Sequence, residues 1–182
     1  MARIIACVGL LVFATICSSA PREKLYQNVG KVNIEVHTVE SIQEFQQKHA
    51  MLKLTPLARV AAPGLDTHTA SSDGQSDGIQ AQNKVNYVIG ARINGDRLVA
   101  QDGVSDVYPT LQDVQVDLQY PAPDAEPGSG AIITYVEISV AQSSDIGNAW
   151  ISEGGIGQRN MKIVLEIGST SYFSLVANIY GY

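Results

Sequence analysis

The C-terminal half of the chain alternates apolar and polar residues with a period of two. From 114 to 120, 136 to 140, 161 to 167 and 173 to 179, every second residue is apolar. Successive side chains of a β-strand point to opposite faces, so this period predicts strands with one buried and one solvated face. Glycine and proline separate these segments, and no helical spacing lies between them. We therefore expect a mainly β fold, an antiparallel β-sandwich or barrel-like sheet, and not a parallel α/β sheet.

A turn signal lies between two earlier apolar stretches, Val85 to Ile93 and Arg97 to Val104. Asn94-Gly95 favours a tight turn, because both positions prefer positive φ. This pattern predicts a β-hairpin. Residues 121 to 130, with three prolines and two glycines, are expected to form a loop.

The segments before residue 85 differ from the β-rich part. Residues 25–60 contain an alternating stretch, 32 to 39, followed by helical spacing that starts near Ser41, so they predict a strand-helix extension. Residues 61–84 have no aromatic residue and are rich in Ser, Gly, Asp and Gln, which is typical of a flexible linker. We thus expect an extension at 25–60, a linker at 61–84 and a β-rich domain at 85–182.

The N-terminus has the layout of a secretory signal peptide over residues 1–19. Arg3 precedes an apolar run of fourteen residues, and small residues follow it. This run is shorter than the roughly 20 residues that span a bilayer, so a membrane anchor is not expected. Cleavage is expected after Ser19, with Ala20 as the alternative. Cleavage would also remove Cys7 and Cys17, and the secreted chain would then contain no disulfide.

The composition is acidic, with 12 basic and 18 acidic residues and a net charge of −6. Phosphate backbones are bound by clustered Lys and Arg, whereas the basic residues here are scattered. Direct nucleic-acid binding is therefore not expected. An unidentified protein partner is the expected ligand, and the sequence leaves the oligomeric state open.

One glycine-rich segment invites comparison with a phosphate-binding loop. Gly154, Gly155, Gly157 and Gln158 are followed by an alternating strand pattern and lack the Lys-Ser/Thr pair of such loops. A tight turn or bulge between strands is the favoured interpretation. No nucleophile elbow, zinc motif or Cys/His cluster is present, so the sequence predicts no enzyme, catalytic residue, metal or cofactor.

Four segments resemble the insect multiprotein bridging factor family of the second type, which also includes small salivary secreted peptides. They are YVIGARINGDRLV from Tyr87, ITYVEISV from Ile133, AWISEGGIGQRNMKIVLEI from Ala149 and the ending NIYGY. The most specific parts are the turn with Gly154, Gly155, Gly157 and Gln158 and the terminal Ile179, Tyr180 and Gly181. The resemblance implies protein partners and offers no catalytic residues.

Three functions follow as hypotheses. The first is a secreted, extracellular, non-enzymatic binding or structural protein of insect type, in saliva, haemolymph, venom or another gland secretion. The second, implied by the family's namesake, is a transcriptional coactivator that bridges a DNA-bound regulator to the general transcription machinery. The third is a carrier that holds a small apolar ligand inside the sheet.

Overall fold

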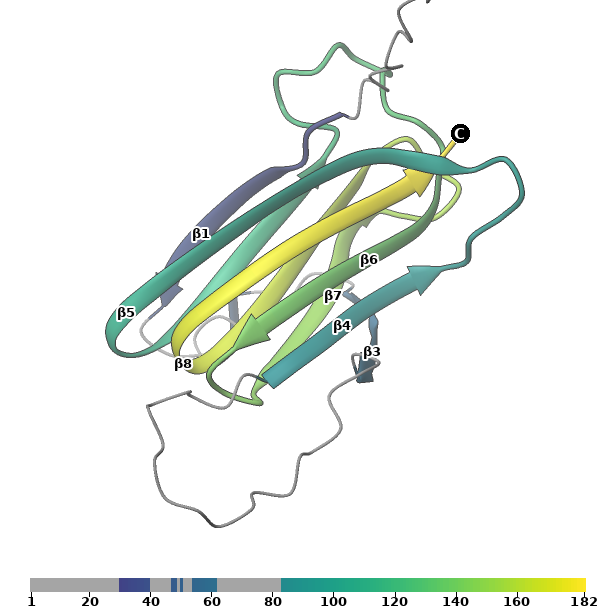
Figure 1. Ribbon diagram of the computed structural model, residues 1–182. Coiled ribbons are helices and arrows are strands. Elements are labelled where there is room, and N and C mark those ends of the chain that lie inside the picture. The colour runs from purple at the N-terminus through teal and green to yellow at the C-terminus, as the bar shows by residue number, and fades with distance from the viewer. Residues whose placement is uncertain (1–29, 40–46, 49, 51–53, 62–82) are drawn as a thin grey trace, which may run out of the picture.

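Figure 1 shows the protein as a computed structural model, which describes residues 30–39, 47–48, 50, 54–61 and 83–182. Eight strands form one antiparallel sheet. The strands are β1 (Asn33–Val39), β2 (Thr55–Pro56), β3 (Ala58–Ala61), β4 (Asn83–Gly90), β5 (Arg97–Tyr120), β6 (Ile133–Gln142), β7 (Gly147–Gly154) and β8 (Met161–Gly181). The prediction of a mainly β, antiparallel fold is confirmed.

The long strands β5 and β8 are neighbours in the interior of the sheet. They pair antiparallel along their whole length, with Arg97 opposite Gly181 and Tyr120 opposite Met161. The other edge of β8 pairs with β7 in its first half and with β6 in its second half. β4 and β3 continue the sheet beyond β6, while β1 lies beside the second half of β5. The sheet is open, since β1 and β3 lie at its two ends.

The β5–β8 ribbon bends in its middle. Its register shifts between Val107 and Gln112, where four residues of β5 lie opposite Ser171 alone. Such an insertion disrupts the ladder and bends the strand. On β8, Ser169 has a positive φ of 48°, and its N–H donates to the Asp113 carboxylate at 2.7 Å. The bend folds the sheet so that its two halves face one another.

The core lies between these two halves. Leu118 and Ile163 from one half line the same small void as Ile138 and Ala177 from the other half. The void measures about 10 Å³, which is about the room that a single water molecule needs by the same measure. The space between the described strands therefore cannot hold a small apolar ligand, and the carrier hypothesis has no support in the fold.

The N-terminal segments join the same sheet. β1 is the predicted strand at 32 to 39, and it pairs with β5. β2 pairs with β7, and β3 pairs with β4. The predicted helix lies outside the described residues except for Gln47 and Lys48, which are helical, and Ala50. The signal segment, Ser19, Ala20 and linker residues 62–82 also lie outside them.

The predicted hairpin around Asn94 is wrong, although the turn itself is present. β4 pairs with β6, and β5 pairs with β8, so two strands separate β4 from β5. The Asn94-Gly95 signal specifies a local reversal, with Gly95 at φ 89°, but it does not specify which strands pair. Residues 91–96 instead cross the ends of β6 and β8. The sequence also failed to predict β2, β3 and β7.

Candidate functional site

The connection 91–96 is fastened to the two strands that it crosses. The Arg92 side chain donates to the Asp96 carboxylate from Nε and Nη2, at 2.7 to 3.1 Å. Asp96 also accepts the N–H of Ile93 at 3.0 Å and the hydroxyl of Thr134 on β6 at 2.9 Å. Its side chain is only 1% exposed. The pKa of Asp96 is lowered to about 2, chiefly because Arg92 donates hydrogen bonds to the charged form.

Arg92 also covers an aromatic pair on the outer face of the sheet. Its guanidinium carbon lies 3.8 Å from the ring centroid of Tyr180 on β8, which is a cation–π contact. The ring of Tyr135 on β6 is 5.8 Å from that of Tyr180. Burial, and then the neighbouring Glu137 carboxylate, raise the pKa of Tyr135. The Tyr135 hydroxyl therefore stays protonated and can donate a hydrogen bond.

The glycine-rich segment forms the turn between β7 and β8. Gly154, Gly155 and Gly157 all have positive φ, at 69°, 144° and 81°. The N–H of Gly157 donates to the Ile133 carbonyl at 2.8 Å, and the N–H of Ile133 donates to the Gln158 carbonyl at 2.9 Å. The amides of Gly155 and Gln158 are likewise bonded to carbonyls. Because these donors are occupied, the segment is a structural turn that offers no cradle for phosphate.

The terminal motif reaches the same place. Ile179 is buried in the core, and Tyr180 points to the outer face under Arg92. Gly181 lies between Arg97 and Ile133, and a Cβ atom there would come within 2.2 Å of the Ile132 carbonyl. The structure thus brings the connection 91–96, the glycine-rich turn and the terminal motif together around the start of β6.

We call this region the loop end. It comprises the connection 91–96, the loop 121–132, the turn 155–160 and Tyr182. Its exposed apolar side chains are Ile93, Ile156 and Tyr182, at 47%, 40% and 58% exposure. No local sequence signal could reveal this gathering, because it depends on the pairing of β4, β6 and β8.

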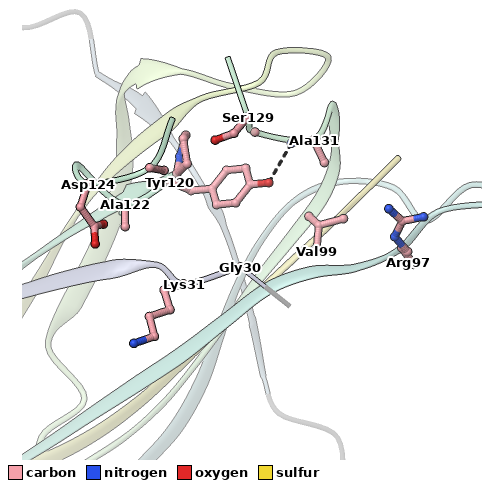
Figure 2. Close-up of a pocket in the computed structure, with 12 residues that line it drawn as sticks. Gly30, Lys31, Arg97, Val99, Tyr120, Ala122, Asp124, Ser129 and Ala131 are labelled. Carbon is pink, nitrogen blue, oxygen red and sulfur yellow. Dashed lines mark hydrogen bonds between the residues drawn. The ribbon is translucent and has the colours of Figure 1, made fainter. Parts of the chain in front are cut away.

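The loop end also carries a cavity of about 380 Å³ between the loop 121–132 and the start of β5. Figure 2 shows the Tyr120 ring in its wall, with the Tyr120 hydroxyl accepting the N–H of Ala131 at 2.9 Å. Lys31 and Arg97 lie on opposite sides of this ring and do not converge on one point (Figure 2). These two side chains therefore do not form a cationic clamp for one phosphate group. Arg159 fastens the loop to the turn by donating to the Gly130 carbonyl at 2.8 Å.

The histidines do not form a catalytic or metal site in the described part of the chain. His37 lies on β1, 3.6 Å from the Asp117 carboxylate and 3.8 Å from that of Glu35. His49 and His68 lie outside the described residues. No group of three or more His, Cys, Asp or Glu residues that could hold a metal occurs within the described ranges. Within the same ranges, no helix has the length and apolar character needed to cross a membrane.

The fold is one open antiparallel sheet that bends back on itself, and its loop end exposes Ile93, Ile156 and Tyr182. Residues 89–181 match the family described as Transcription activator MBF2, and this range is just over half of the chain. The chain belongs to this family, so the resemblance seen in the C-terminal half is confirmed. No curated protein and no solved structure matches the chain.

The family corrects the prediction of secretion. A transcription activator family points to a role in the nucleus, which contradicts a signal peptide, an extracellular location and a secreted binding or structural protein of gland secretions. The reason lies in the pattern: a short apolar run behind one cation is also compatible with a retained segment. The expected removal of Cys7 and Cys17 depended on signal cleavage, so this prediction is no longer supported. The family suggests protein partners.

Proposed function

We propose that this protein is a transcription activator that works through protein contacts and bridges a DNA-bound regulator to the general transcription machinery. The observation that carries the proposal is the family match. The matched residues, 89–181, also include Ile156 and the cluster formed by Arg92, Tyr135 and Tyr180. Arg and Tyr dominate the binding energy of many protein interfaces. Exposed Ile156 adds apolar area that a partner can bury.

The proposal assigns the contact with DNA to the partner. The net charge is −6, and Lys31 and Arg97 diverge around Tyr120 (Figure 2). Non-specific DNA binding depends on several clustered cations that release counterions from the phosphates. We also propose that the protein is not an enzyme and that it acts without a cofactor, since its function requires only surfaces.

A tethering assay tests the proposal. The full chain is fused to a heterologous DNA-binding domain and directed to a promoter upstream of a reporter gene. We expect reporter activation, and we expect it to fall at least several-fold with the double change Ile93→Asp and Ile156→Asp, because charge at the loop end would oppose burial against a partner.

Leu111→Asp is the matched control, because Leu111 is 66% exposed and lies at the bend, away from the loop end and outside residues 102–107. It should leave activation unchanged. Nuclear abundance is measured for every variant. A fusion that is present in the nucleus and does not activate would refute the proposed function. Activation that survives the double change would refute the assignment to the loop end.

A further inference from the structure

One edge of β5 has no strand partner between Asp102 and Val107 among the described residues. β1 covers this edge only along the second half of β5. Just before the free stretch, the N–H of Gly30 donates to the Val99 carbonyl at 2.7 Å, and the N–H of Gln101 donates to the Gly30 carbonyl at 3.3 Å. The edge is therefore bonded to the backbone of Gly30 beside Ala100, and beyond Gln101 it has no backbone partner among the described residues.

The backbone groups of this edge point away from β8. Because the N–H of Gln101 points toward Gly30, the alternation of a strand directs the amides of Gly103 and Ser105 to the same side. The N–H of Gly103 already donates to Oδ1 of its neighbour Asp102 at 2.8 Å, so the Ser105 N–H and the Gly103 and Ser105 carbonyls are the groups left to pair. Gly103 and Ser105 are also exposed. The edge thus offers N–H and C=O groups for a further strand.

A groove of about 530 Å³ runs beside this edge, between the start of β1 and β5. Its walls include the half-buried side chains of Ile34 and Val104 and the carboxylates of Asp102 and Asp124, with Lys31 as its basic residue. Asp106 follows on the same face of β5, two places beyond Val104. The groove therefore combines apolar contact with an excess of negative charge.

We propose that the β5 edge, residues 102–107, binds an extended cationic segment of a partner protein as an added strand. The Ser105 N–H and the Gly103 and Ser105 carbonyls supply hydrogen bonds, and Ile34 and Val104 contact an apolar side chain. The carboxylates of the groove and of the same β5 face attract Lys or Arg; they are those of Asp102, Asp106 and Asp124. This inference goes beyond the proposed function, because it concerns a different surface and a different partner chemistry.

A second copy of the chain is the less suitable occupant. Two β5 edges paired antiparallel would place Asp102 and Asp106 of both copies close together, and like charges across a strand pair are destabilising. We therefore do not expect two copies of the chain to pair through this edge. A dimer that Ser105→Pro converts to monomers would overturn the inference.

The test uses two synthetic octapeptides, one alternating lysine with valine and one alternating glutamate with valine, and the full chain. Binding is followed by titration calorimetry and by amide hydrogen exchange. We expect the lysine–valine peptide to bind more tightly by at least tenfold, its affinity to fall with added salt, and its binding to slow amide exchange at Ser105.

Ser105→Pro removes the outward N–H without breaking a bond to β8, because proline is tolerated where the amide faces away from the sheet. It should abolish binding of the lysine–valine peptide, whereas Ser105→Ala, which keeps the N–H, should not. Asp102→Asn with Asp106→Asn should weaken binding at least tenfold. Asp145→Asn, an exposed carboxylate near the bend, is the charge control.

Three results would overturn the inference: equal binding of both peptides, unchanged affinity in Ser105→Pro, or exchange protection that falls on β1 or β3 instead of β5. The melting temperature of each variant shows whether it is folded. The peptide assay contains no transcriptional readout, so its failure leaves the proposed function intact, and the reverse also holds.

Discussion

Asp96 connects three segments of the loop end through one carboxylate. It accepts hydrogen bonds from Arg92, from the N–H of Ile93 and from the hydroxyl of Thr134, while its side chain is almost fully buried. The sequence placed Asp96 in a turn, but it could not show that Thr134, 38 residues later, would lie beside it. The partners of Asp96 depend on the crossing of β6 by residues 91–96.

The low pKa of Asp96 predicts a pH dependence of stability. The folded-state pKa is about 2 and the unfolded value is about 3.9, so the stabilisation is complete above about pH 5 and is lost as the pH falls toward 2. The free energy of unfolding is measured by denaturant titration at pH 6 and pH 2.5. Asp96→Asn should destabilise the protein more at pH 6 than at pH 2.5.

The control for this prediction is Asp145→Asn, because Asp145 is exposed and its carboxylate has no hydrogen-bond partner in the described structure. The Asp145 variant should show the same small difference at both pH values. An Asp96→Asn effect of equal size at pH 6 and pH 2.5 would contradict the role assigned to the ionised carboxylate.

Gly181 is required by close approach and not by its φ angle. A Cβ atom there would meet the Ile132 carbonyl at 2.2 Å, and a backbone carbonyl between paired strands cannot move aside. Gly181→Ala should therefore lower the free energy of unfolding by about 1–3 kcal/mol, as overpacking does. Thermal denaturation monitored by circular dichroism measures this change.

Gly128→Ala provides the comparison, since a Cβ there meets nothing within 4 Å and only the φ of 80° opposes it. Its cost should be about 1 kcal/mol, the typical strain of a left-handed residue. If Gly181→Ala is as stable as the wild type, the tight junction between the terminal motif and β6 is not present in solution.

At the scale of elements, β8 carries two different surfaces on one strand. Leu165 is fully buried between the halves of the sheet, whereas Val176 is 38% exposed on the outer face. Leu165→Ala should cost about 2–5 kcal/mol, because it leaves a cavity in the core. Val176→Thr keeps a β-branched side chain and should change stability by about 0.5 kcal/mol or less.

Chemical denaturation of the two variants measures the difference. The slope of the free energy with denaturant should stay the same, since both variants expose the same surface on unfolding. Comparable costs at the two positions would mean that the outer face of β8 is covered by something more than solvent.

The elements also show what alternation can and cannot predict. The strands around Val116, Ile138, Ile163 and Leu175 were predicted because one face is apolar and the other polar. Their lengths were not predicted, because β5 and β8 each continue through the bend. No local sequence pattern marks the bend, where the exposed Val107 lies. β7 was missed although its inward Ala149 and Ile151 alternate, since flanking glycines shorten the pattern.

At the scale of the whole molecule, strand pairing is the information that the sequence lacked. The turn at Asn94 was predicted, but the pairing of β4 with β6 depends on contacts about 50 residues apart, such as Tyr87 with Ile138. The motifs around Gly157 and Tyr180 were identified singly, and only the fold brings them to one loop end. The N-terminal apolar run predicted secretion, which the family contradicts.

The central claim is that the loop end contacts the transcription machinery. A photo-crosslinking amino acid is placed at Ile156 or, as the control, at the exposed Leu111 in the full chain, and crosslinked proteins are identified from irradiated nuclei by mass spectrometry. We expect position 156, and not position 111, to capture a DNA-bound regulator or a general transcription factor. Recovery of the chain outside the cells, or nuclear crosslinks that are the same from both positions, would contradict it.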